Sequence, residues 1–271
     1  MLLNQYKYIE CRLEQGVAEL ILNRVEVHNA FDEVMISEMI HAIESFANDN
    51  QCTMLILRAN GKNFSAGADL NWMRKQAKMD VGQNLADAQE LAKLMHVLDK
   101  FPKPTIALVQ GAAFGGALGL ICCCDIAIAN THASFCLSEV KLGLIPAVIS
   151  PYVVRAMGNR QARRFMLTAE RFSADMALTH QVIHDINDDL DAAAAPFVEA
   201  FNANSPQAMA WAKNLVSHLE NGVIDAATRN FTSEQIARIR VSDEGQEGLN
   251  AFLEKRTPAW QASKSDPQGA Q

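Results

Sequence analysis

Short apolar runs and helical spacings of apolar residues alternate along the first two thirds of the chain. Two β-rich runs, residues 8–13 and 17–22, lie on either side of Glu14-Gln15-Gly16 and predict a hairpin. Three continuous apolar runs are typical of strands that are buried on both faces. These runs cover residues 53–57, 105–109 and 126–129. The pattern therefore predicts a sheet with a buried centre.

Helices are predicted between these strands and throughout the last third of the chain. Asp32 is a suitable N-cap for a helix that runs to about Phe46. Further helices are expected from about residue 69 and at residues 84–99, 155–167, 174–180, 190–203 and 206–219, with a last patterned segment at 234–255. We therefore expect an α/β core over residues 1–200, a helical region over 201–262 and a disordered tail over 263–271.

The composition excludes several classes of protein. The 271 residues are 49% hydrophobic, which excludes a wholly disordered chain and allows a large core. The formal net charge is −7, and no run of Lys or Arg offers a face that would neutralise phosphates, so nucleic acid is not an expected partner. Residues 104–124 are uncharged, but glycine pairs interrupt them, so we expect a strand, a turn and a helix there, and no membrane span.

The cysteine pattern indicates a reducing compartment. None of the six cysteines has CxxC spacing, and three are consecutive at residues 122–124 within an apolar stretch. We expect reduced, buried thiols, with neither a disulfide framework nor a zinc site. Residues 1–16 contain no apolar segment of the kind that directs export. The sequence therefore predicts a cytoplasmic protein.

Two glycine-containing loops are candidates for binding an anion or an oxyanion. The first is FSAGADL at residues 64–70, and the second is QGAAFGGA at residues 110–117, between a predicted strand and a predicted helix. Small residues let the backbone approach a ligand, and unpaired N–H groups at a helix N-terminus can stabilise a developing oxyanion. The alternative is that these glycines only form tight turns. Neither loop matches GxGxxG or a P-loop, which argues against a nucleotide cofactor.

Glu139 is the candidate acid/base. Apolar residues surround it in the sequence FCLSEVKL, and burial of a carboxylate raises its pKa towards the range useful for proton transfer. The alternative is a surface glutamate at the end of an edge strand, or an ion-pair partner of Lys141. The seven histidines are scattered without HExxH spacing, so no metal site is predicted. No GxSxG sequence supports a serine hydrolase.

Together and in this order, these segments resemble the enoyl-CoA hydratase/isomerase (crotonase) family. The similar segments are LNRVEVHNAF at 22–31, FSAGADL at 64–70, the glycine turn and helix from 110 to 126, Glu139 with LGLIP at 142–146, and EG and AFLEKR within 247–256. Val25 stands where the family usually has a proline. The resemblance covers nearly the whole chain.

The resemblance implies a fold, a ligand and an assembly. The fold would be a spiral of ββα units with a C-terminal helical trimerisation region, assembled as a homotrimer or a dimer of trimers. The ligand would be an acyl-CoA thioester, with coenzyme A as part of the substrate and no separate cofactor. By this resemblance, the backbone N–H groups of Ala68 and Gly116 would form an oxyanion hole. Contacts to CoA would come from Ser65, Ala66, Asp69 and Leu70, and, from a neighbouring subunit, Phe252 and Lys255.

One departure from the family pattern affects the expected reaction. Hydratases of the family with two catalytic carboxylates carry the first glutamate three residues after the oxyanion glycine, and here that residue is Gly119. Three interpretations remain open: a hydratase that relies on Glu139, a double-bond isomerase that moves a proton with Glu139 alone, and a CoA-ester-binding protein with little chemistry. Residues 138–151, in which Ala147-Val148-Ile149 replaces a glycine-rich stretch, look most like methylglutaconyl-CoA hydratases of bacteria. This likeness favours the hydratase.

Overall fold

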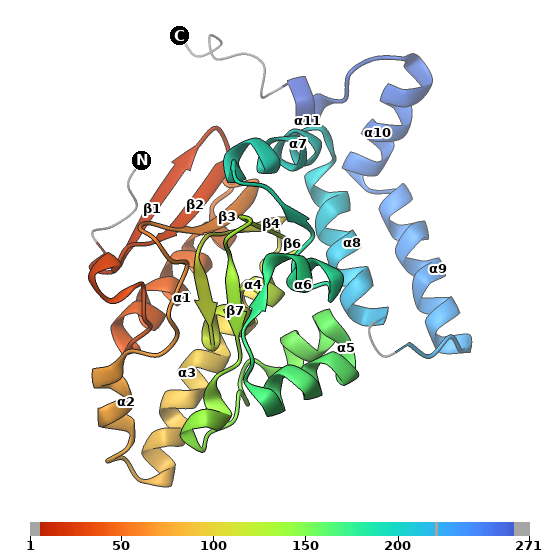
Figure 1. The fold of residues 1–271 in the computed structure, drawn as a ribbon. Coiled ribbons are helices and arrows are strands. Elements are labelled where there is room, and N and C mark those ends of the chain that lie inside the picture. The colour runs from red at the N-terminus through yellow and green to blue at the C-terminus, as the bar shows by residue number, and fades with distance from the viewer. Residues whose placement is uncertain (1–5, 220–221, 263–271) are drawn as a thin grey trace. The chain divides into compact units, whose positions relative to one another are not determined.

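The computed structural model describes residues 6–219 and 222–262, in two compact units (Figure 1). The first unit contains the described residues up to Phe101, together with Thr105–Ala195. The second contains Pro102–Pro104 and the chain from Pro196 onwards. The helix α7 (Leu190–Ala203) runs from the first unit into the second. The predicted division into an α/β core over residues 1–200 and a helical region over 201–262 stays a prediction. The predicted disordered tail lies outside the described residues.

A six-stranded sheet organises the first unit. Its order is β1-β2-β3-β4-β6-β9, formed by β1 (Ile9–Glu14), β2 (Val17–Leu22), β3 (Met54–Ala59), β4 (Thr105–Val109), β6 (Ile126–Ala129) and β9 (Asp185–Ile186). Only β1 is antiparallel to its neighbour, and the predicted hairpin is therefore confirmed. Every residue of β4 is buried, as expected for an inner parallel strand between helices.

A second, three-stranded sheet was not predicted. It has the order β5-β7-β8 and consists of β5 (Ala112–Phe114), β7 (Ser134–Cys136) and β8 (Phe172–Ser173). Strand β5 lies inside the glycine-containing loop at residues 110–117, and β7 ends three residues before Glu139. This small sheet therefore joins the two segments in which the sequence indicates chemistry.

Several helices of the first unit begin at residues whose side chains accept hydrogen bonds from their first N–H groups. In α1 (Glu33–Asn48) the predicted N-cap Asp32 accepts a hydrogen bond from the N–H of Met35 at 2.9 Å. Helix α3 (Val81–Asp99) begins three residues before the predicted start, because Asp80 and Gln83 form a capping box. The remaining helices are α2 (Leu70–Gln76), α4 (Gly116–Cys123), α5 (Ser150–Thr168) and α6 (Ala174–Thr179), with 3-10 turns at Val25–Val27 and Glu139–Leu142.

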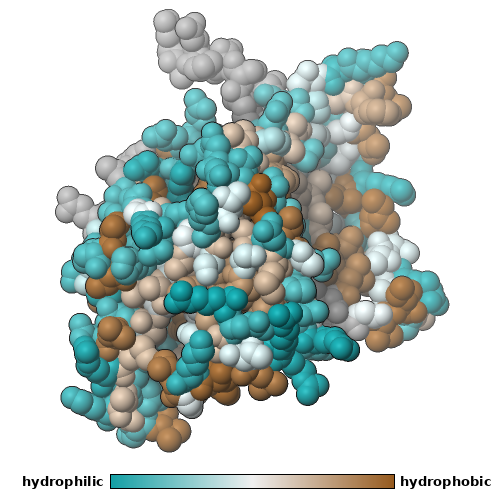
Figure 2. Space-filling view, in the orientation of Figure 1, coloured by the Kyte–Doolittle hydropathy of each residue, from teal (hydrophilic) through white to brown (hydrophobic). Residues whose placement is uncertain are grey.

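The second unit is helical, as predicted. After α7 it contains α8 (Pro206–Leu219), α9 (Ala226–Arg240), α10 (Asp243–Glu254) and α11 (Ala259–Ala262). The patterned segment at 234–255 is divided between α9 and α10, because the Ser242 hydroxyl caps α10 by accepting from the N–H of Gly245 at 3.1 Å. Apolar side chains are exposed on these helices, including Phe252 and Leu253, and brown areas mark such residues in Figure 2.

Two sequence predictions about the chain as a whole are also addressed by the structure. All six cysteines are buried free thiols, as predicted. Within residues 6–219 and 222–262, no helix is long and apolar enough to cross a membrane. Residues 104–124 instead form β4, β5 and α4, as their glycine interruptions indicate.

Candidate active site

The first glycine-containing loop is fixed by pairing with Phe31. The N–H of Phe31 donates to the carbonyl of Gly67 at 2.7 Å, and the N–H of Asp69 donates to the carbonyl of Phe31 at 2.8 Å. A parallel bridge of this kind uses the groups on either side of Ala68, so the N–H of Ala68 itself points away from Phe31. Ala68 is exposed. The pairing with Phe31 therefore leaves this amide available to a ligand.

The second loop approaches the first through β5. The N–H of Ser65 donates to the carbonyl of Ala112 at 3.0 Å, and the N–H of Phe114 donates to the carbonyl of Ser65 at 3.0 Å. After β5 the chain turns at Gly115, which has a φ of 54° and is the N-cap of α4. Such a φ favours glycine because it carries no Cβ. The glycines therefore form a turn, and that turn also opens a helix next to the first loop.

Gly116 supplies the second predicted amide. It is the first residue of α4, and the first N–H groups of a helix have no partner within that helix. A Cβ at Gly116 would lie 3.5 Å from the ring of Phe31. Phe31 thus contacts Gly116 through its ring and pairs with the Ala68 segment through its backbone. The structure therefore brings the two predicted oxyanion-hole residues, Ala68 and Gly116, next to the same residue, Phe31.

Glu139 lies beside the start of α4. Its Oε1 atom is 3.2 Å from the position of a Cβ at Gly115. Its Oε2 atom is buried and has no hydrogen-bond partner in the part of the chain that the structure describes. Burial raises the pKa of Glu139 above its ordinary value of 4.5. These features fit an acid/base group and not the alternative of a solvated surface glutamate.

The position of the missing first glutamate is filled by other residues. Gly119 lies in α4, where a Cβ would stand 2.4 Å from Cγ2 of Ile149 and 2.9 Å from Sδ of Met95. Ile149 and Met95 are both buried. Gly119 therefore has no room even for a methyl group. The sequence shows that the carboxylate is absent, but not that its place is occupied.

Two of the residues expected to contact CoA have their side chains engaged within the protein. Ser65 is fully buried, and its hydroxyl accepts from the N–H of Gly67 at 3.2 Å. Asp69 is buried, and its Oδ1 atom caps α2 by accepting from the N–H groups of Asn71 and Trp72 at 2.7 and 3.0 Å. Their side chains support the loop. Ala66 and Leu70 are exposed, as contact with a ligand requires.

Arg24 forms ion pairs that hold the first glycine-containing loop, a role that was not predicted from the sequence. Its Nη1 atom lies 3.1 Å from Oδ2 of Asp69 and 3.2 Å from Oδ2 of Asp32, and it donates to the carbonyl of Ala30 at 2.9 Å. Burial acts to raise the pKa of Asp69, but the N–H groups of α2 and the Arg24 guanidinium hold it below its usual value. The sequence contained one sign of this role: Arg24 and Phe31 both lie in the segment LNRVEVHNAF, which resembles the family.

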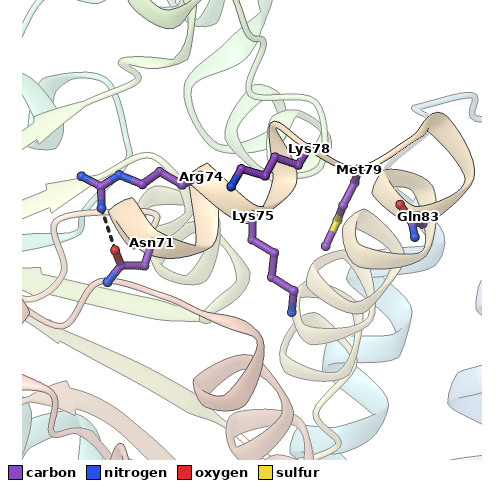
Figure 3. Close-up of a pocket in the computed structure, with 6 residues that line it drawn as sticks. All are labelled: Asn71, Arg74, Lys75, Lys78, Met79 and Gln83. Carbon is purple, nitrogen blue, oxygen red and sulfur yellow. Dashed lines mark hydrogen bonds between the residues drawn. The ribbon is translucent and has the colours of Figure 1, made fainter.

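A basic pocket of about 520 Å³ lies at α2 and the start of α3 (Figure 3). It is lined by Asn71, Arg74, Lys75, Lys78, Met79 and Gln83. Arg74 donates to the side chain of Asn71 at 2.6 Å, and Lys75 forms an ion pair with Glu33 at 2.6 Å. Helix α2 directly follows the first glycine-containing loop, so the pocket residue Asn71 lies only three residues after Ala68 along the chain.

The remaining predicted site residues belong to the second unit. Phe252 is 82% exposed on α10, and Lys255 is the C-cap of this helix with a φ of 55°. Their exposure leaves them available to another molecule, and their contact with CoA stays a prediction. In the described part of the chain, no three His, Cys, Asp or Glu side chains gather as metal ligands.

Comparison with known proteins identifies the family of the chain. The sequence pattern of the enoyl-CoA hydratase/isomerase family matches residues 12–263. The solved structure of an enoyl-CoA hydratase from Shewanella pealeana is 73% identical, with a TM-score of 0.94 over 94% of this chain and 97% of that chain. An enoyl-CoA hydratase of Alternaria alternata is 33% identical over 87% of this chain and 74% of its own length. The 2,3-dehydroadipyl-CoA hydratase of Escherichia coli is 29% identical over 90% of this chain and 95% of its own length. The chain is therefore an enzyme of the enoyl-CoA hydratase/isomerase family and has the α/β fold of that family.

Proposed function

We propose that this enzyme adds water across the 2,3 double bond of an enoyl-CoA thioester. The observation that carries this proposal is the buried Oε2 atom of Glu139, which has no hydrogen-bond partner among the described residues. The Oε1 atom of the same side chain lies beside the start of α4. Burial raises the pKa of this carboxylate, which favours a group that both accepts and returns a proton. The net charge argues against nucleic acid as the main partner.

In the proposed reaction Glu139 takes a proton from water while the water oxygen bonds to the β-carbon of the acyl group. The π electrons move towards the thioester, and the resulting enolate oxygen accepts hydrogen bonds from the N–H groups of Ala68 and Gly116. Glu139 then delivers the proton to the α-carbon, which completes the addition of water. Fixed backbone donors of this kind stabilise a developing oxyanion more strongly than its ground-state carbonyl.

We further propose a branched or carboxylated acyl group, such as that of methylglutaconyl-CoA. The name of the Escherichia coli relative denotes a substrate with a carboxylated acyl group. The basic pocket at α2 and α3 lies close along the chain to the first glycine-containing loop, residues 64–70. Its arginine and lysine side chains could form ion pairs with a distal carboxylate of the acyl group. The expected setting is a cytoplasmic homotrimer or dimer of trimers that needs no separate cofactor. The buried free cysteines and the exposed apolar residues of α10 support this expectation.

A second candidate is double-bond isomerisation with Glu139 as the single proton carrier. Ile149 and Met95 fill the space that a side chain at Gly119 would need, so no second carboxylate can stand there. This favours isomerisation, which needs only one carboxylate. The two reactions separate when a 2-enoyl-CoA and its 3-enoyl isomer are incubated in ¹⁸O-labelled water. Hydration predicts loss of the conjugated thioester absorbance with incorporation of ¹⁸O. Double-bond migration without the label would establish the isomerase, and binding without either reaction would indicate a CoA-ester-binding protein.

A further inference from the structure

Three buried elements meet at Gly119. Gly119 lies in α4, Met95 lies in α3, and Ile149 is the N-cap of α5. A Cβ at Gly119 would lie 2.8 Å from Cβ of Ile149 as well as 2.4 Å from its Cγ2. The Cβ atom of Ile149 is fixed to the backbone, so a change of rotamer cannot move it away. A larger residue at Gly119 would therefore require α4 and the start of α5 to separate.

The filled space at Gly119 lies about one helical turn from the residue beside the proposed acid/base, Glu139. The Glu139 carboxylate contacts the Gly115 position, and Gly119 follows four residues later, roughly one helical turn along α4. A carboxylate at residue 119 would therefore stand about one turn from Glu139. Here the same space holds the hydrocarbon of Ile149 and the thioether of Met95, and Sδ of Met95 is in turn 4.0 Å from Sγ of Cys123.

We propose that Ile149 is a specificity-determining residue of this enzyme. Its side chain closes the place next to Glu139 in which a second carboxylate could hold water. Glu139 is then the single carboxylate for both proton transfers, and the balance between water addition and double-bond migration depends on the residue at position 149. The claim that residue 149 affects water addition rests on the proposed function. The claim that Ile149 fills the space at Gly119 does not.

The closure is tested by thermal unfolding of the full chain. Gly119→Ala is compared with Gly82→Ala, because Gly82 is also helical but a Cβ there would have only Asp80 Oδ1 nearby, at 3.4 Å. We expect Gly82→Ala to keep or raise the Tm, since alanine favours helices. We expect Gly119→Ala to lower the Tm by about 3–10 °C, as overpacking of a core does. In an Ile149→Gly background, which removes both the Cβ and the Cγ2 of residue 149, the cost of Gly119→Ala should fall markedly.

The chemistry is tested with the double variant Gly119→Glu/Ile149→Gly and with Ile149→Gly alone, in ¹⁸O-labelled water. We expect the ratio of ¹⁸O incorporation to double-bond migration to rise at least ~10²-fold in the double variant, which is the low end of a general acid/base contribution. A folded double variant with the wild-type ratio would overturn the proposal. So would a Gly119→Ala variant as stable as Gly82→Ala, or a cost of Gly119→Ala that is unchanged in the Ile149→Gly background. If wild-type enzyme turns over neither isomer, the proposed function fails, and the unfolding measurements still decide whether Ile149 closes the position.

Discussion

The Oε1 atom of Glu139 lies 3.2 Å from the point that a Cβ at Gly115 would occupy. The carboxylate therefore lies beside the N-terminus of α4, and a side chain at residue 115 would crowd the acid. The next residue is Gly116, whose N–H is a proposed oxyanion donor. The proposed acid/base group and one proposed oxyanion donor therefore lie near each other in the free protein.

Replacement of Glu139 by glutamine tests the acid/base assignment. The amide has nearly the same size, but it cannot accept and return the proton. We expect Glu139→Gln to reduce kcat by at least ~10², which is the usual size of a general acid/base contribution. Steady-state hydration of a 2-enoyl-CoA measures this effect, with circular dichroism as the control for folding. Turnover near the wild-type rate would remove Glu139 from the mechanism.

The pH dependence of the rate should show the raised pKa of Glu139. Burial raises this pKa above 4.5, and only the ionised carboxylate can take a proton from water. We expect the rate to fall as the pH is lowered through this raised value, so the acidic limb of the profile lies above pH 4.5. An acidic limb at or below the ordinary glutamate value would contradict the burial argument.

Stability should depend on pH in the opposite sense. Because the pKa of Glu139 is higher in the folded protein than in the unfolded chain, the folded protein binds this proton more tightly. The contribution is fully present below about pH 4.5 and is lost as the pH rises through the folded value. We expect Glu139→Gln to be more stable than wild type at pH 7, and this difference to vanish near pH 4. Urea unfolding at the two pH values measures it, and equal differences at both would contradict the prediction.

The oxyanion assignment can be tested at Gly116 with a matched pair of substitutions. Proline is tolerated at the first residue of a helix but has no N–H, whereas alanine keeps the N–H. A Cβ at this position meets the Phe31 ring at 3.5 Å, which is ordinary contact. We expect Gly116→Pro to lose at least ~10² in kcat, as loss of one oxyanion donor does, and Gly116→Ala to lose much less. Equal kcat values in the two folded variants would refute the role of this amide.

Arg24 should contribute to the stability of the folded protein by holding the loop that carries Ala68. Its side chain is 11% exposed and lies between Asp32 and Asp69, so Arg24→Met leaves two largely buried carboxylates without their cation. Breaking a buried ion pair in this way costs about 3–5 kcal/mol of unfolding free energy. Arg12 is the control, because its pair with Glu10 is exposed and should contribute about 0–1 kcal/mol. Denaturant unfolding compares Arg24→Met with Arg12→Met, and similar losses would argue against the supporting role.

The predicted CoA contact of the second unit can be tested at Phe252. This side chain is 82% exposed, so Phe252→Ala should leave the thermal stability of the chain nearly unchanged. We expect it to raise KM for the CoA ester several-fold with little change in kcat, because the contact would act on binding. The neighbouring Leu253→Ala, at a residue that is 74% exposed, is the control. A KM increase of the same size in both variants would show that the effect is not specific to Phe252.

Several features of the fold follow from short-range patterns in the sequence. The strands β3 and β4 were predicted from continuous apolar runs, and α1 and α2 start next to the caps Asp32 and Asp69. These features depend on residues within one or two turns of one another, which is why the sequence predicts them. The same holds for the motifs of the two glycine-containing loops, whose order along the chain identified the family.

Other features depend on contacts between distant segments. The strands β5, β7, β8 and β9 have only two or three residues each, so pairing with remote partners and not local propensity decides them. The burial of Glu139 and its contact with Gly115 arise in the same way. At Gly119 the sequence determined that a carboxylate is missing. Only the tertiary structure decided that its place is closed, because Ile149 and Met95 reach it from elements 30 residues after and 24 residues before it along the chain.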